Sequence, residues 1–299
     1  MSLEVIADLT VLYNEPLAKY TAARLGGPAD TVAIARTRQA LLEAVIYAHQ
    51  QHIPYWVLGG GANVLVADGG VRGLVIINHT KGVEIDPATG RVQAESGVSL
   101  ITLARRCLVQ GLKGLEWAVS IPGTLGGAVV NNAGAHGGDM AGNLVQAIIM
   151  DIEASYEPSV WPVERLAYAY RYSILKGQHQ YLVLDATLQL EAGHDPHELT
   201  VTADGFIAHR KRTQPPGASL GSMFKNPSGD YAGRLIEAAG LKGHQVGGVQ
   251  ISPIHANFFI NLDAGTATDY HALIELVQSQ VLARFGVELE LEIELLGDK

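Results

Sequence analysis

Three observations predict a globular α+β protein with more than one module. Segments with apolar residues at helical spacing are interspersed with short apolar runs bounded by glycine and proline, a mixture typical of helices combined with strands. The chain has 299 residues, which leaves room for two or three domains at roughly 100–200 residues each. The run Pro215-Pro216-Gly217 interrupts this pattern and marks a boundary between modules.

Residues 1–77 are predicted to form the first module, a small unit with a β-α-β core. Leu41, Leu42, Val45 and Ile46 follow the 3–4 spacing of a helix, and Pro54 follows its end. The expected elements are a helix over 38–50 and strands over 29–35, 54–58, 62–68 and 73–78.

Residues 78–213 are predicted to form the second module. The sequence PATG at 87–90 is expected to form a turn between the strands at 73–78 and 91–96. Asp195 and Pro196 suit the cap and first turn of a helix. The expected elements are strands over 91–96, 144–152 and 181–190 and helices over 99–110 and 195–213.

Residues 214–299 are predicted to form the third module. Thr266 and Asp269 have the spacing of a capping box ahead of an apolar helical stripe. Residues 287–295 alternate apolar and acidic side chains, which predicts a closing strand with four glutamates on one face. Most of these glutamates are expected to be solvated. The other expected elements are a helix over 232–239 and a strand over 257–261.

The composition excludes several classes of protein. Hydrophobic residues make up 47% of the chain and charged residues 17%, which is typical of a folded globular protein. The formal net charge is −9, and the densest basic run is His209-Arg210-Lys211-Arg212. A general nucleic-acid binder is therefore not expected. That basic run suits either the C-terminal end of a helix or a single diphosphate.

The single cysteine and the N-terminal residues bear on location and on metal binding. Cys107 excludes an internal disulfide and any two-cysteine metal motif, and its apolar neighbours place it in a core. No metal site is expected. The opening residues lack the basic and long apolar regions of a signal peptide. No segment approaches about 18 uninterrupted apolar residues, so a cytoplasmic protein is expected. The sequence carries no prediction of the oligomeric state.

Two glycine-rich stretches are candidates for ligand binding. Residues 117–135 read WAVSIPGTLGGAVVNNAGA, and this stretch fits either a buried glycine-rich turn or an anion-binding loop. A second cluster, Gly59-Gly60-Gly61-Ala62-Asn63, favours the anion-binding interpretation. Neither stretch has the G-x-G-x-x-G pattern, so the dinucleotide-binding fold is not expected.

Five motifs in order resemble one family. They are GGGANVLVAD at 59–68, SIPGTLGGAVVNNAGA at 120–135, YRYSILK at 170–176, GSMFKNP at 221–227 and LELEIELLG at 289–297. Over nearly its whole length the chain strongly resembles the UDP-N-acetylenolpyruvoylglucosamine reductases, in their compact subclass. The resemblance implies a two-subdomain FAD-binding fold of the flavin-oxidase type, followed by a C-terminal α+β substrate-binding domain. The corresponding boundaries are 1–77, 78–213 and 214–299.

The resemblance also implies an activity. Members of the family are NADPH-dependent flavoenzymes of bacterial peptidoglycan precursor synthesis. They reduce UDP-N-acetylglucosamine enolpyruvate to UDP-N-acetylmuramate, with hydride from FAD added to C3 and a proton added to C2. FAD is the implied cofactor, with NADPH as co-substrate.

Site residues carry over from the family motifs. The implied catalytic residues are Arg171, which stabilises negative charge, Ser222, which donates a proton, and Glu292, which shares or relays charge. Taken singly, each residue fits a structural role better: Arg171 a surface ion pair, Ser222 a turn after Gly221, and Glu292 a solvated strand position. Their occurrence together in the family order favours the catalytic roles. The implied cofactor residues are Arg24, Gly26, Gly27, Gly59, Gly60, Gly61, Ala62, Asn63, Ser120, Ile121, Gly123, Gly126, Gly127, Asn131, Ala133 and Gly134. The implied substrate residues are Tyr170, Lys225, Asn226, His255 and Asn257.

Two departures from the family pattern and two rival functions remain open. Leu291 stands where the family often has proline, and Thr213 stands where it commonly has a basic residue, so Lys211 or Arg212 is a candidate for a diphosphate contact. One rival is a flavin oxidase acting on an alcohol or sugar. The absence of histidine from the segment Arg24–Gly27 disfavours a covalently attached flavin. The other rival is a non-catalytic nucleotide-binding module.

Overall fold

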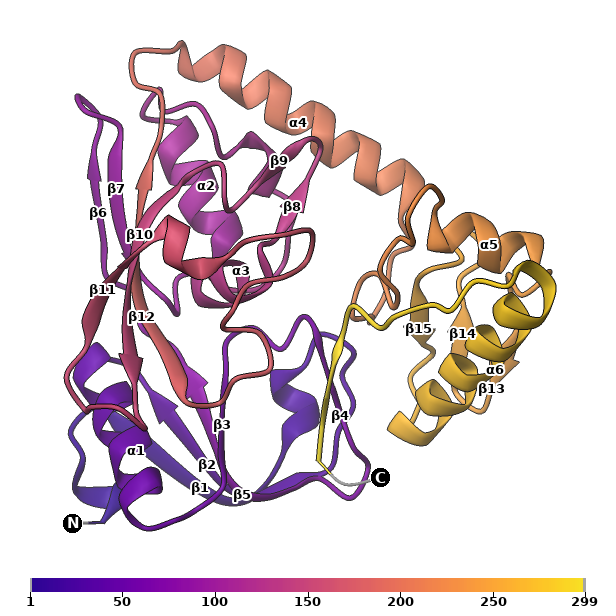
Figure 1. Ribbon diagram of the computed structural model, residues 1–299, viewed down its shortest axis with the longest axis horizontal. Coiled ribbons are helices and arrows are strands. Elements are labelled where there is room, and N and C mark those ends of the chain that lie inside the picture. Colours follow the sequence, from indigo (N-terminus) through magenta and orange to yellow (C-terminus); the bar gives the residue numbers. More distant parts are fainter. Residues whose placement is uncertain (1, 298–299) are drawn as a thin grey trace. The chain divides into compact units, whose positions relative to one another are not determined.

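The computed structural model describes residues 2–297, which divide into two compact units (Figure 1). The first unit consists of residues 2–12, 31–60 and 73–209. The second consists of residues 13–30, 61–72 and 210–297. Each unit therefore combines segments that are far apart in the sequence. The contiguous division at residues 77 and 213 stays a prediction.

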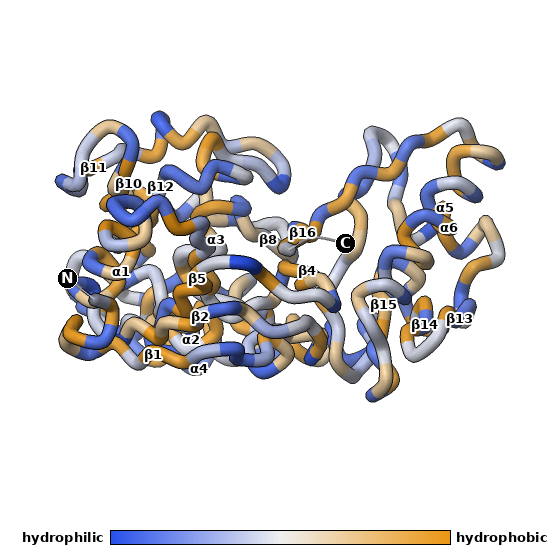
Figure 2. The backbone as a smooth tube through the Cα atoms, turned by 90° about the horizontal axis from the view of Figure 1, so that it is seen from below, coloured by the Kyte–Doolittle hydropathy of each residue, from blue (hydrophilic) through white to orange (hydrophobic). Residues whose placement is uncertain are grey.

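A four-stranded sheet and one helix form the N-terminal part of the fold. In spatial order the strands are β1 (Leu9–Pro16), β2 (Pro28–Ala35), β5 (Val71–Asn78) and β3 (Tyr55–Leu58). Strands β3 and β5 are parallel, and α1 (Arg38–Gln50) packs against β3. Figure 2 shows that α1 and β5 are largely hydrophobic, in keeping with their buried residues. The predicted helix over 38–50 is confirmed.

A second, five-stranded antiparallel sheet belongs to the first unit. Its strands in order are β11 (Ser159–Pro162), β10 (Leu144–Asp151), β12 (Tyr181–Gln189), β7 (Arg91–Glu95) and β6 (Val83–Asp86). The predicted turn at 87–90 is present and joins β6 to β7, and the strand β6 itself was not predicted. The cause is that the short strand β6 is only partly buried and gives a weak hydrophobic signal.

Two helices cover the core of this sheet. Helix α2 (Leu100–Leu108) is capped by the Ser99 side chain, and its residue Cys107 is fully buried in the core, as predicted. Helix α3 (Leu125–Asn131) packs against β7 and β12. Helix α3 was not predicted, because glycine at positions 126 and 127 lowers helix propensity and packing must compensate.

One long helix and several short elements accompany these sheets. Helix α4 (Pro196–Thr213) begins where the Asp195 carboxylate accepts the His197 N–H at 2.8 Å, as its predicted cap requires. The short elements are the 3₁₀ turns Leu3–Val5, Leu17–Tyr20, Glu116–Ala118 and Val163–Leu166 and the strands β8 (Gly134–Ala135) and β9 (Gly138–Asp139).

The second unit has its own core. Its antiparallel sheet contains β13 (Gln245–Val246), β14 (Val249–Ile251) and β15 (Phe259–Asn261). Helix α6 (Ala267–Phe285) packs against β13, β14 and α5 (Ala232–Ala238). The predicted capping box of Thr266 and Asp269 is present at the start of α6. Tyr270 in α6 is fully buried and its hydroxyl donates to the Phe259 carbonyl at 2.9 Å.

The predicted closing strand over 287–295 is largely wrong. The structure has only β16 (Glu294–Leu296), which pairs in parallel with β4 (Val64–Val66). Leu291 forms an isolated bridge to Phe224, and a bend follows at 292–293. The strict alternation fails because the chain changes its pairing partner at this bend. As a result Leu295, which the alternation placed on the buried face, is 48% exposed.

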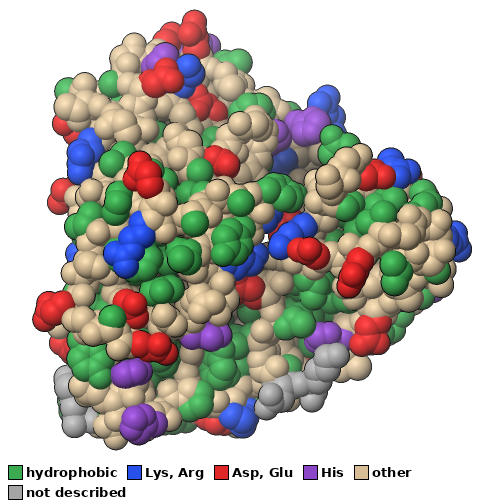
Figure 3. All heavy atoms as spheres, in the orientation of Figure 1, with side chains coloured by type: hydrophobic (Ala, Val, Ile, Leu, Met, Phe, Trp, Pro, Cys, Tyr) green, Lys and Arg blue, Asp and Glu red, His purple; other side chains and the backbone are tan. Residues whose placement is uncertain are grey.

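Two further features are the charge distribution on one face of the surface and the hydropathy of the helices. On the face shown in Figure 3, acidic and basic side chains are interspersed. None of the helices within residues 2–297 is both long enough and apolar enough to cross a bilayer.

Candidate active site

Gly59 and Gly60, which begin the first predicted glycine loop, lie against the second loop within the first unit. A Cβ added to Gly59 would lie 2.2 Å from Thr124 Oγ1, and one on Gly60 would lie 3.0 Å from Gly123 Cα. Gly123 itself has φ +112°, a conformation that side chains disfavour. The loops approach this closely because these positions lack side chains. Two motifs separated by sixty residues of sequence thus form one local structure.

Backbone bonds fix the second loop. The Leu125 N–H donates to Val98 O and the Gly126 N–H donates to Ser96 O, both at 2.8 Å. The Thr124 side chain caps α3 by accepting from Gly127 N. The residue preceding a helix is commonly threonine or serine, so Thr124 carried a signal that the sequence analysis missed. These bonds make the loop rigid.

Two predicted cofactor residues carry buried oxygens without partners. Within residues 2–297, Ser120 Oγ and Asn131 Oδ1 are both buried and make no hydrogen bond. Leaving a buried polar atom unpaired costs about 1–3 kcal/mol, so such atoms call for a ligand or an ordered water. Both atoms belong to the segment 120–134 predicted to contact FAD. The residues present therefore fit a polar cofactor at this loop.

Six predicted cofactor residues belong to the second unit: Arg24, Gly26, Gly27, Gly61, Ala62 and Asn63. Local packing already accounts for the three glycines among them. A Cβ on Gly27 would lie 2.1 Å from Asp68 O, and one on Gly61 would lie 2.0 Å from Tyr20 O. A Cβ on Gly26 would lie 2.8 Å from Val66 Cβ. Arg24 is exposed with φ +56°. Contacts of this group with FAD stay predictions.

Arg171 lies on the glycine loop of the first unit. Its Nη2 donates to the carbonyl of Gly134, a predicted cofactor residue, at 3.0 Å. The guanidinium carbon lies 5.4 Å from the centre of the Tyr170 ring, which is within cation–π range. Tyr170 is 55% exposed and open to a ligand. The structure thus brings the predicted catalytic arginine to the predicted cofactor loop.

Ser222 and Glu292 belong to paired segments of the second unit. The Glu292 N–H donates to Met223 O, and the Lys225 N–H donates to Glu290 O, both at 2.9 Å. These two bonds flank the bridge between Phe224 and Leu291. Neither bond uses the Leu291 N–H, so leucine in place of the family's frequent proline leaves this pairing unchanged. The Asn63 amide donates to the Glu292 carbonyl at 3.1 Å and fixes the same segment.

Asn257 holds the opposite side of the Ser222 segment. Its own carbonyl accepts the Met223 N–H at 2.8 Å. Its side-chain amide accepts from Phe224 N at 3.0 Å and donates to Phe224 O at 2.8 Å. Asn257 is only 3% exposed. Both ends of the amide are engaged by the backbone, so the structure gives Asn257 a scaffold contact that the sequence analysis did not foresee.

The other predicted substrate residues lie on the surrounding loops of the second unit. The Lys225 ammonium pairs with Glu290 at 3.0 Å, and Asn226 Oδ1 accepts from Ala232 N at 3.1 Å at the start of α5. Burial lowers the pKa of His255 below its usual value. Its Nδ1 accepts from Asn257 N at 3.3 Å, which leaves the proton of the neutral ring on Nε2.

The basic run at 209–212 lies at the end of a helix, one of its two predicted settings. Arg210, Lys211 and Arg212 occupy the last turn of α4, where cations suit the helix dipole. Burial lowers the pKa of Arg210. The alternative of a diphosphate contact stays a prediction.

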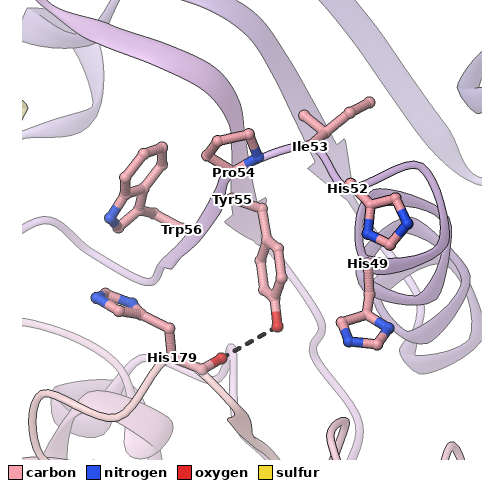
Figure 4. Close-up of a pocket in the computed structure, with 7 residues that line it drawn as sticks. All are labelled: His49, His52, Ile53, Pro54, Tyr55, Trp56 and His179. Carbon is pink, nitrogen blue, oxygen red and sulfur yellow. Dashed lines mark hydrogen bonds between the residues drawn. The ribbon is translucent and has the colours of Figure 1, made fainter.

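A hollow of about 390 Å³ lies elsewhere in the first unit (Figure 4). Its lining residues are His49, His52, Ile53, Pro54, Tyr55, Trp56 and His179. The Tyr55 hydroxyl donates to His179 O at 3.0 Å, and the Tyr55 ring stands between His179 and the other two histidines. None of the predicted site residues lines it. Within residues 2–297, no three His, Cys, Asp or Glu side chains are grouped to bind a metal ion.

Family models identify the class of protein. Residues 29–150 match the model of an FAD binding domain. Residues 213–296 match the model of the UDP-N-acetylenolpyruvoylglucosamine reductase C-terminal domain. The first model covers α3 and the two glycine loops, and the second covers Ser222 and Glu292. The chain is an FAD-binding oxidoreductase, and the predicted fold class is confirmed.

Full-length relatives identify the family. The chain is 44% identical over 301 residues to a UDP-N-acetylenolpyruvoylglucosamine reductase of Synechococcus sp. (strain WH7803), covering 99% of this chain and 96% of the relative. A reductase of the same name from Rubrobacter xylanophilus is 44% identical over 288 residues, covering 96% and 95%. The crystal structure of the Thermus caldophilus enzyme superposes with a TM-score of 0.81 at 34% identity, covering 96% of this chain and 98% of that one. The chain belongs to the UDP-N-acetylenolpyruvoylglucosamine reductase family.

Proposed function

We infer that this chain is a flavoenzyme that uses NADPH to reduce UDP-N-acetylglucosamine enolpyruvate to UDP-N-acetylmuramate in peptidoglycan precursor synthesis. The full-length family relationship supports the activity. The hydrogen bond from Arg171 to Gly134 is the observation that carries the assignment of the site. It places a permanent cation on the loop that the FAD-binding model covers. A cytoplasmic location stays an expectation.

The glycine loops and their buried oxygens would hold FAD. Gly59, Gly60 and Gly123 allow a close backbone approach, and exposed N–H groups of such loops suit a pyrophosphate. Ser120 Oγ and Asn131 Oδ1 supply further polar contacts. When bound, FAD supplies the hydride that reduces C3 of the enolpyruvyl group.

Arg171 is proposed to stabilise the charge that this reduction creates. Hydride addition at C3 leaves enolate-like charge beside the substrate carboxylate. A guanidinium is permanently cationic and can bind a carboxylate through two parallel hydrogen bonds. Its bond to Gly134 fixes one edge of the group on the glycine-rich loop.

Ser222 and Glu292 are proposed to complete the reaction. Ser222 donates a proton to C2, and a free hydroxyl is too weak an acid to do so without assistance. Glu292 lies on the segment paired with Met223, the neighbour of Ser222, which supports a role beside the serine. We propose that its carboxyl group shares or relays charge. Tyr170, Lys225, Asn226 and His255 are the proposed contacts of the UDP-sugar.

A visible spectrum tests the function. The purified protein should be yellow, bleach when NADPH is added without oxygen, and regain its colour on addition of the UDP-enolpyruvyl sugar. A colourless protein would support a non-catalytic module. A yellow protein whose flavin is reduced by a sugar alcohol and reoxidised by oxygen, without NADPH, would support the oxidase rival.

A further inference from the structure

Arg171 occupies a strained position in a closed turn. Ala169 and Tyr172 exchange two backbone hydrogen bonds of 3.1 Å, and Tyr170 and Arg171 form the two residues between them. Arg171 has φ +54°. The third position of a turn with positive φ favours glycine or asparagine, which lack the steric penalty of a long side chain. Strain of this kind persists only where the surroundings impose it.

Two hydroxyl groups impose this strained conformation by bonding the residues on either side of the turn to the end of α3. On one side of the turn, the Tyr168 hydroxyl donates to Val129 O at 2.8 Å. On the other side, Ser173 Oγ donates to Val130 O at 2.6 Å. These consecutive carbonyls belong to the last turn of α3, where helix carbonyls lack partners within the helix. Both flanks of the turn are therefore anchored to one rigid element.

The environment makes these bonds strong and specific. Ser173 is fully buried, and burial raises the pKa of Tyr168, so neither hydroxyl exchanges its partner easily for water. Asn132, 4% exposed, adds a third contact by donating to Ala169 O at 3.1 Å. A buried carbonyl that loses its donor is left unpaired. The loss of either hydroxyl would therefore favour relaxation of the turn.

We propose that Ser173 and Tyr168 are positioning residues that hold Arg171 in its catalytic orientation through the carboxyl end of α3. The proposal rests on the proposed role of Arg171. The Arg171 side chain is held at both ends. Its guanidinium bonds to Gly134, and its backbone lies in the turn that the two hydroxyls anchor. Relaxation of the turn would move the guanidinium away from the reacting carboxylate without removing any group that touches substrate.

A double-mutant cycle in kcat tests this proposal. Ser173→Ala and Tyr168→Phe should each lower kcat on the order of 10-fold to 100-fold, since a displacement near 1 Å can cost about 100-fold. Bound FAD should be retained. In an Arg171→Ala background, the same substitutions should cause no further loss, because they act through the residue already removed. A purely structural role would lower kcat equally in both backgrounds.

Controls separate the possible outcomes. Ser279 also donates its hydroxyl to a helix carbonyl, Leu276 O at 2.9 Å, but lies in α6 on the surface, so Ser279→Ala should retain the parental kcat. If Ser173→Ala does not fold, Tyr168→Phe, which keeps the ring, carries the test. Parental kcat in Tyr168→Phe and Ser173→Ala, with a slow Arg171→Ala, would overturn the positioning role alone. Parental kcat in Arg171→Ala would overturn the proposed catalytic role as well.

Discussion

The segments that carry Arg171 and Ser222 are held in different ways. Side-chain hydroxyls anchor the Arg171 turn to the end of α3, and the turn keeps a strained backbone. Backbone hydrogen bonds on both edges hold the Ser222 segment, to Asn257 on one side and to Glu290 and Glu292 on the other, and the Asn257 side-chain amide adds two bonds to Phe224. An arrangement that depends on side chains is sensitive to single substitutions. One that depends mainly on backbone pairing tolerates most of them, with Asn257 as the exception in this segment.

This difference predicts in which segment a substitution can affect catalysis without affecting the supporting structure. In the Ser222 segment, removing the catalytic side chain should leave the supporting structure intact. In the Arg171 turn, catalysis should also fail when a neighbouring hydroxyl is lost. The following variants are ordered by the size of the expected effect.

Ser222→Ala tests the proton donor with the least structural disturbance. The backbone bonds of its neighbours Met223 and Phe224 do not use its hydroxyl. We expect product formation to fall by about 10²–10⁴-fold, the usual contribution of a general acid, while FAD stays bound and is still reduced by NADPH. The rate of product formation and the rate of flavin reduction by NADPH, measured separately, give the answer. Parental turnover would show that another group supplies the proton.

Arg171→Ala should lower kcat by about 10²–10³-fold, the usual cost of removing one fixed donor to developing charge. Arg165→Ala is a matched control in the same unit. The Arg165 guanidinium also stacks on an aromatic ring, with its carbon 3.5 Å from the Trp161 ring centre, but the residue has no proposed catalytic role. The control should turn over at the parental rate. An effect of Arg171→Ala on KM alone would argue against charge stabilisation.

Asn257→Ala tests the scaffold of the Ser222 segment. It removes two hydrogen bonds and leaves the backbone N–H and carbonyl of Phe224 unpaired, so unfolding free energy should fall by about 2–4 kcal/mol. Turnover should fall too, because the segment loosens. Chemical denaturation and steady-state kinetics measure the two effects.

Asn261→Ala is the control for this scaffold. Asn261 is also buried and bonds two backbone groups, Ala23 O at 2.8 Å and Gly265 N at 2.9 Å. The Asn261→Ala variant should lose a comparable amount of unfolding free energy and keep the parental kcat. Equal losses of kcat in both variants would mean that general destabilisation explains the Asn257 effect.

The smallest expected effect is a dependence of stability on pH. Burial lowers the pKa of His255, so the native state takes up its proton at a lower pH than the unfolded state, whose histidine titrates near 6.5. Unfolding free energy should therefore fall as the pH drops below about 6.5, and this loss should stop below the native pKa. Denaturation of His255→Gln between pH 5 and pH 8 should show a shallower slope, and an unchanged slope would refute the assignment.

Local signals predicted much of the fold. The helix over 38–50, the capping box at Thr266 and the buried Cys107 depend on neighbouring residues, and all three are confirmed. Helix α3 was missed because Gly126 and Gly127 weaken its local signal, and its packing on β7 and β12 is visible only in the structure.

Features that depend on distant partners could not be predicted. The alternation over 287–295 indicated one strand, yet the chain pairs first with Phe224 and then with β4. The positive φ of Arg171 depends on anchors supplied by α3. Ser120 was predicted from a motif, but only the structure shows that its buried hydroxyl has no partner within residues 2–297.

The most direct test of the account separates the two half-reactions in single turnovers without oxygen. Arg171→Ala and Ser222→Ala, each loaded with FAD, should bleach with NADPH at a rate close to that of the parent. On addition of the UDP-enolpyruvyl sugar, the parent should recover its colour rapidly, and both variants should recover it at least 100-fold more slowly, the lower limit expected for removing such a group. Recovery at the parental rate in either variant would contradict its catalytic role.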